Sequence, residues 1–169
     1  MPGFPQLIQE DYDCFKEALG GLLQQSEAAS VLIVEKAGYL IHEAGDSSGF
    51  DTTQVATLAS NAFNATQFMA SLLSEPNFSG MYQQGENFST LILNIDENAL
   101  LVVVFKAALS VGMIKYYSTR TIETLAAQLT AATQRNPEGV FDLADLDPTD
   151  VGELFKSKGA GESASPQGT

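Results

Sequence analysis

The sequence predicts an α/β domain in which a five-stranded antiparallel sheet carries helices on both faces. Three observations lead to this prediction. Apolar residues recur at helical spacing in three long segments, short β-branched runs lie between those segments, and turn residues separate the runs. The resulting order is helix, two strands, long helix, three strands, helix, which we expect to form a sandwich over residues 9–135.

The first predicted elements are a helix and a hairpin. Tyr12, Phe15 and Leu19 recur at helical spacing within residues 9–25. Residues 30–36 contain a Val-Leu-Ile-Val run, which is typical of a strand, and residues 39–43 follow after Ala37-Gly38. The spacing therefore predicts a β-hairpin across that turn.

The longest helix is expected over residues 52–74. Asp51 is the candidate N-cap, and Gln54 follows three residues later, as in a capping box. The helix carries two apolar stripes, whereas a helix on the surface of a sheet needs only one. The second stripe therefore indicates another binding partner, and its members are Leu58, Ala65, Phe68 and Leu72.

The second half of the domain is predicted to be a meander followed by a helix. Residues 88–95 and 99–105 read as strands joined by Asp96-Glu97-Asn98, and residues 111–117 as a third strand. Ser118 or Thr119 is then expected to cap a helix that stops at Asn136-Pro137.

Both ends of the chain are predicted to lie outside the domain. Residues 1–8 form an N-terminal extension, and residues 136–158 form an acidic linker with a short amphipathic helix that presents Val151, Leu154 and Phe155. That helix either docks on its own domain or fits a groove on a partner. Residues 159–169 are rich in Gly, Ser and Ala and are expected to be disordered.

Composition excludes several classes of function. Eight basic residues face 21 acidic ones, and the formal charge of -13 argues against nucleic-acid binding. No segment approaches the length of a membrane span, and no secretory signal is present, so a cytoplasmic protein without membrane insertion is expected. The sequence has no phosphate-binding loop, and Cys14 and His42 are the only residues of their types, so neither a cofactor nor a metal nor a catalytic residue is predicted.

Several stretches together resemble the Roadblock/dynein light chain domain family, in particular its bacterial gliding-motility regulators. They are residues 31–38, 51–58, 101–105 and 110–115, with an acidic C-terminal segment at 141–155. The resemblance implies a cytoplasmic homodimer, sometimes placed at a cell pole, in which two subunits bind one Ras-like small GTPase. Such regulators stimulate GTP hydrolysis without inserting an arginine, and the C-terminal helix of some members reaches a separate surface of the GTPase and favours nucleotide exchange.

The resemblance also implies where the GTPase binds. The expected contacts are residues on the outer side of the long helix and on the C-terminal helix, namely Asn61, Asn64, Ala65, Phe68, Leu72, Val151, Leu154 and Phe155. Asn61, Asn64 and Phe68 are bulkier than the small residues expected on that helix, so the partner surface can differ from that of relatives. The alternative is a non-catalytic scaffold, in which a Roadblock dimer only organises a larger complex.

Overall fold

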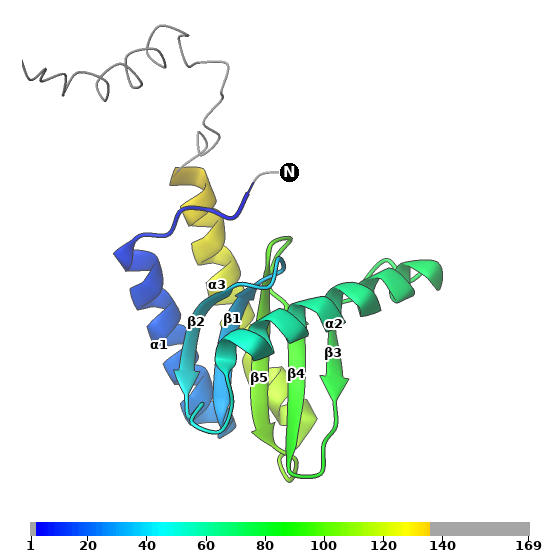
Figure 1. Ribbon diagram of the computed structural model, residues 1–169. Helices are drawn as coiled ribbons and strands as arrows, with labels where there is room; N and C mark the ends of the chain where they lie inside the picture. The colour runs from blue at the N-terminus through cyan, green and yellow to red at the C-terminus, as the bar shows by residue number, and fades with distance from the viewer. Residues whose placement is uncertain (1–2, 136–169) are drawn as a thin grey trace, which may run out of the picture.

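A computed structural model describes residues 3–135, and its five-stranded antiparallel sheet lies between two layers of helix (Figure 1). The predicted fold class is confirmed. The elements are α1 (Gln9–Ser26), β1 (Ser30–Glu35), β2 (Leu40–Gly45), α2 (Thr52–Leu72), β3 (Gly80–Gln83), β4 (Phe88–Asn94), β5 (Ala99–Lys106) and α3 (Val111–Arg135). In space the strands follow the order β2-β1-β5-β4-β3, so β2 and β3 form the two edges of the sheet.

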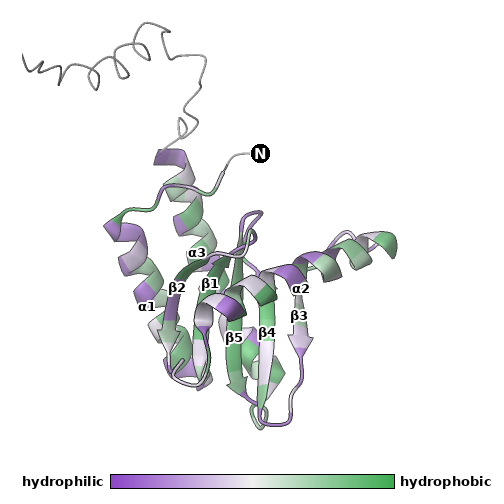
Figure 2. Ribbon diagram, viewed as in Figure 1, coloured by the Kyte–Doolittle hydropathy of each residue, from purple (hydrophilic) through white to green (hydrophobic). Residues whose placement is uncertain are grey.

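Both faces of the sheet are buried. Successive residues of a strand point to opposite faces, and on β5 Leu101 and Val103 join the core under α1 and α3, whereas Leu100 and Val102 join the core under α2. The central strands are therefore apolar on both sides, as the hydropathy colouring shows (Figure 2). This double burial is why β1 and β5 stand out in the sequence as unbroken apolar runs.

One predicted strand is wrong. Residues 111–117 form the first turns of α3, and the amide of Ile114 donates to the carbonyl of Ser110 at 3.1 Å. Ser118, predicted as a possible cap, is instead buried inside this helix. The buried positions of α3 recur every three or four residues, so the pairing with α1 outweighs the local preference of valine, isoleucine and tyrosine for strands. The buried positions are Ile114, Ser118, Thr121, Leu125, Leu129 and Ala132.

The sheet contains a strand that the sequence did not predict, β3. It has only four residues, and it pairs with β4 from Gly80 opposite Leu93 to Gln83 opposite Thr90. The meander therefore comprises β3, β4 and β5, one element earlier in the chain than expected.

The start of α1 and the end of α3 are joined around Asp11, which is fully buried. Its carboxylate accepts hydrogen bonds from the Ile8 amide at 2.8 Å, from Gln128 Nε2 at 2.7 Å and from Arg135 Nη2 at 2.5 and 2.6 Å. Burial by itself would raise the pKa of Asp11, but these donors and the positive charge of Arg135 hold that pKa below its usual value. The described chain ends at Arg135, so the predicted helix with Val151, Leu154 and Phe155 and the tail at 159–169 lie outside the described residues.

Within residues 3–135, no helix combines the length and the hydrophobicity that a membrane crossing requires.

Candidate partner-binding surface on α2

Helix α2 begins as predicted and lies on the sheet through a narrow buried face. The Asp51 carboxylate accepts a hydrogen bond from the Gln54 amide at 3.0 Å, which confirms the predicted cap. The buried residues of the helix are small except for one phenylalanine, and they are Ala56, Ala59, Ser60, Phe63 and Ala70. Phe63 reaches the core between the helix and the sheet, where its ring lies 5.1 Å from that of Phe78.

The opposite side of α2 is exposed along its length. We call it the outer face of α2 and define it by Leu58, Asn61, Ala65, Phe68 and Leu72, all of which are exposed. Leu58 is 65% exposed, Phe68 is 66% exposed and Leu72 is 70% exposed. The structure therefore brings together every helix residue predicted as a contact except Asn64, which lies to one side of this face.

The end of α2 extends past β3, the edge strand that lies beneath it (Figure 1). Met69 and Leu73 are 55% and 74% exposed there. Exposed apolar side chains thus surround the last turns of the helix, next to an edge strand. Such a patch is typical of a protein–protein interface.

Asn64 has a role within the domain. Its side-chain nitrogen donates to the carbonyl oxygen of Lys36 at 3.1 Å, and the hydroxyl of Ser60 donates to the same oxygen. The Lys36 ammonium lies 5.6 Å from the centre of the Phe63 ring. Burial lowers the pKa of Lys36, while the nearby carboxylates of Asp96 and Glu97 oppose that shift.

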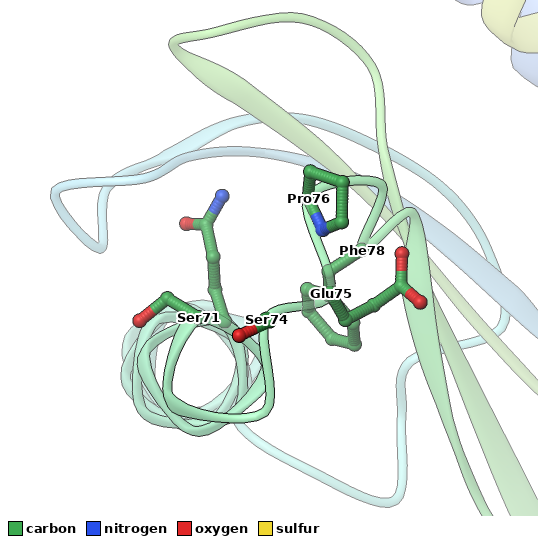
Figure 3. Close-up of a pocket in the computed structure, with 6 residues that line it drawn as sticks. Ser71, Ser74, Glu75, Pro76 and Phe78 are labelled. Atoms are coloured by element: carbon green, nitrogen blue, oxygen red, sulfur yellow. The ribbon is translucent and has the colours of Figure 1, made fainter.

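A pocket at the end of α2 is lined by Gln67, Ser71, Ser74, Glu75, Pro76 and Phe78 (Figure 3), and Glu75 is its one ionisable side chain. Among residues 3–135 no cluster of three or more histidine, cysteine, aspartate or glutamate side chains could hold a metal ion.

Cys14 lines a pocket with Arg120 and Thr121 of α3, and His42 lies on β2. Burial raises the pKa of the Cys14 thiol, and the charges of Glu17, Asp11 and Glu10 add to that shift, so the unreactive protonated form is favoured. The His42 ring lies among aromatic rings, 6.2 Å from Tyr12 and 6.5 Å from Phe15, and burial lowers its pKa. The exposed apolar side chains of α2 remain the feature suited to binding another protein.

Comparison with known proteins agrees with this geometry. No curated protein sequence matches the chain. Among solved structures, one described as MglB with a tetrameric arrangement is 27% identical, with a TM-score of 0.71 over 78% of this chain and 99% of the other. A gliding protein MglB from Thermus thermophilus is 26% identical, with a TM-score of 0.69 over 78% and 99% of the two chains.

A solved structure of lower sequence identity shares the fold. Myxococcus xanthus MglB is 24% identical, with a TM-score of 0.70 over 75% of this chain and 96% of that one.

The family model for the Roadblock/LC7 domain matches residues 15–105, from the middle of α1 to the end of β5. More than half of the sequence therefore fits that model, and with the sheet order and the two helical layers described above, the chain belongs to the Roadblock/LC7 domain family.

Proposed function

We propose that this chain is a homodimeric regulator of an MglA-like, Ras-like small GTPase, which stimulates GTP hydrolysis in the control of cell polarity or motility. The observation that carries the proposal is the outer face of α2. This face exposes large apolar side chains, although the opposite side of the helix already packs against the core of the domain. The likeness to structures described as MglB supports the choice of a GTPase as the partner.

The self-association surface is proposed at β3 and at Met69 and Leu73, beside the outer face at the end of α2. An edge strand presents unpaired backbone groups, and β3 is four residues long beside the exposed Met69 and Leu73. Pairing two copies there would cover both the strand edge and the apolar end of the helix. The two outer faces would then lie near each other and could contact one GTPase together.

The regulator acts by positioning groups of the GTPase. The sequence has two arginines, Arg120 and Arg135, and both lie on α3, across the sheet from α2. Arg135 is also paired with Asp11. An arginine finger from the outer face of α2 is therefore impossible, so the groups that stabilise the transition-state charge come from the GTPase itself.

The proposed contacts are Asn61, Ala65, Phe68 and Leu72 on the outer face, with Asn64 at its border. Val151, Leu154 and Phe155 are proposed to bind a second surface of the GTPase and to favour nucleotide exchange. The acidic residues of that segment would complement a basic patch on the partner.

The decisive experiment measures GTP turnover by a purified MglA-like GTPase from the same organism, with and without this protein. The proposal expects turnover to rise with the concentration of the regulator and to saturate at two regulator subunits for each GTPase. Binding without faster turnover would favour the scaffold alternative, and turnover by the regulator alone would contradict the proposal.

A further inference from the structure

Strand β2 forms the edge of the sheet opposite β3, and within residues 3–135 it pairs with β1 alone (Figure 1). The Asp46 amide donates to the Ala29 carbonyl at 2.8 Å. Hydrogen-bonded and non-hydrogen-bonded pairs alternate along an antiparallel ladder, so the next pair, Ser30 with Gly45, points its backbone groups away from each other. The same alternation directs the backbone groups of Glu43 outward. The outer side of β2 is therefore able to accept another strand.

Exposed apolar side chains border this outer side on the face of the sheet that α1 covers. Tyr39 precedes Leu40, which packs in the core under α2, so Tyr39 points to the α1 face. Tyr39 is 69% exposed, and Ile8 and Tyr12 at the start of α1 are also exposed. The ring of Tyr12 lies 6.2 Å from the ring of His42 on β2. Helix α1 thus leaves apolar surface uncovered beside the edge strand.

The same border carries a positive charge. Burial lowers the pKa of His42, the charge of Glu43 opposes that shift, and the charge of Lys16 adds to it. Glu43 lies opposite Leu32, which is in the core under α2, so Glu43 points to the α2 face. Lys16 is on α1, one turn after Tyr12, and therefore lies on the α1 face. An acidic segment laid along β2 would meet this ammonium group.

The chain beyond Arg135 starts beside this border. Arg135 is paired with Asp11, and the next residue, Tyr12, has its ring beside that of His42. The end of α3 lies at the end of the sheet where β2 begins (Figure 1). Residues 136–144 can extend roughly 30 Å from Arg135. The six residues of β2 extend only about 20 Å, so this stretch is long enough to run along the strand.

Residues 139–144 have a sequence that suits the edge of a sheet. They read Gly-Val-Phe-Asp-Leu-Ala, in which valine and phenylalanine favour strands. Phe141 and Leu143 flank Asp142, so in an extended chain both apolar side chains point to one side. Residues 138–147 carry four acidic side chains and no basic one. The segment therefore offers apolar side chains to the uncovered border and negative charge to its ammonium group.

A second copy of the chain is a weaker candidate for the edge of β2. A segment tethered a few residues away is present at an effective concentration of about millimolar, which exceeds the concentration of a second copy in solution experiments. The proposed contact between protomers also uses β3, at the opposite edge. Covering β2 would remove the other strand edge on which copies could associate end to end.

We infer that residues 139–144 form an additional strand that pairs with β2 of the same chain, with Phe141 and Leu143 on the α1 face. The two strands run in parallel, because the chain leaves α3 at the end of the sheet where β2 begins. The inference goes beyond the proposed function and does not depend on a GTPase. It leaves the apolar residues within 151–155 available to a partner.

Hydrogen exchange of single amides, followed by NMR without GTPase, tests the inference. Truncation after Pro137 removes the segment, whereas truncation after Asp147 keeps it and serves as the matched control. In the full-length protein we expect the Glu43 and Gly45 amides to exchange about tenfold more slowly than in the shorter truncation. The longer truncation should keep this protection. The amides of β3 should exchange equally in all three proteins.

A double variant of the full-length protein, Phe141→Asp with Leu143→Asp, tests the segment itself. It should lose the protection of β2, because charged side chains would face the apolar border. Equal exchange of the β2 amides in the full-length protein and in the truncation after Pro137 would overturn the inference.

Two other results would overturn it as well. Protection that survives in the double variant would mean that another part of the chain covers β2. Protection that rises with protein concentration would assign the edge to a second copy, because a tethered segment binds at the same level at every concentration. No GTPase enters these measurements, so the proposed function is tested separately.

Discussion

Replacing Asp11 by alanine should destabilise the domain by about 2–3 kcal/mol. The variant removes the acceptor for three donors around a fully buried carboxylate. The bond from the Ile8 amide at the start of α1 contributes about 1 kcal/mol, and the bond from Gln128 about the same. Arg135 is 34% exposed and can turn to water, so its ion pair adds only about 0.5 kcal/mol.

The pH dependence of this destabilisation identifies its source. The pKa of Asp11 is lowered in the folded protein from the ordinary value of 3.8. Its contribution to stability is therefore complete above pH 3.8 and is lost as the pH falls through the lower folded value. The stability difference between the unaltered protein and Asp11→Ala should be largest near neutral pH and should narrow in acid.

Urea unfolding monitored by the helical signal measures both effects, with protein concentration fixed because the protein is proposed to dimerise. Arg135→Ala is the matched control, since it removes the exposed partner alone and should cost about 1 kcal/mol or less. A cost below about 0.5 kcal/mol for Asp11→Ala, or a difference that does not narrow in acid, would refute this account of how α1 and α3 are joined.

Three further predictions concern the core of α2, its outer face and the C-terminal segment. Phe63→Ala should lower the free energy of unfolding by about 3–5 kcal/mol, because Phe63 is the one large buried side chain of α2, and calorimetry would detect the loss. Replacing Ala65 and Phe68 together by arginine should abolish GTPase binding and leave a folded dimer of about twice 18.0 kDa in light scattering, because both side chains are exposed. If the double variant unfolds, Ala65 and Phe68 belong to the core and the assignment of the outer face is wrong. Truncation after Pro137 should preserve folding and dimerisation but weaken GTPase binding or change nucleotide exchange, with an effect that shrinks in high salt. Titration of labelled GTPase with the full-length and the truncated protein at two salt concentrations checks this. Identical affinities and exchange rates would remove any role of residues 138–169 in GTPase binding or exchange.

The strong periodic signals of the sequence predicted most of the fold. The α1 helix, the first hairpin, the Asp51 cap and the β4–β5 pair all lie within two residues of the predicted positions. The two errors have one cause. Val111 to Tyr117 favours a strand locally, and only packing against α1, which is remote in sequence, decides that these residues form a helix. Because the strand predicted at 111–117 already completed a five-stranded sheet, the four residues of β3 were not predicted as a strand.

The candidate surface was predictable only in part. The second apolar stripe indicated the exposed positions Ala65, Phe68 and Leu72, and their exposure agrees with that expectation. Whether these residues bind a GTPase stays a prediction. The bonds from Thr57, Ser60 and Asn64 to the β1–β2 turn could not be predicted, because they join residues about twenty positions or more apart through backbone carbonyls, which carry no sequence signal.

The ion pair between Arg135 and Asp11 also decides where the rest of the chain is attached. It fixes the end of α3 beside the start of α1, at the end of the sheet where the β1–β2 turn lies (Figure 1). The chain from Arg135 to Val151 can span at most roughly 58 Å when fully extended. A GTPase held on α2 would therefore meet Val151, Leu154 and Phe155 at the high effective concentration of a tethered ligand, about millimolar. Even a weak contact by these residues would then be occupied whenever the first surface is engaged, and it would vanish when the GTPase leaves.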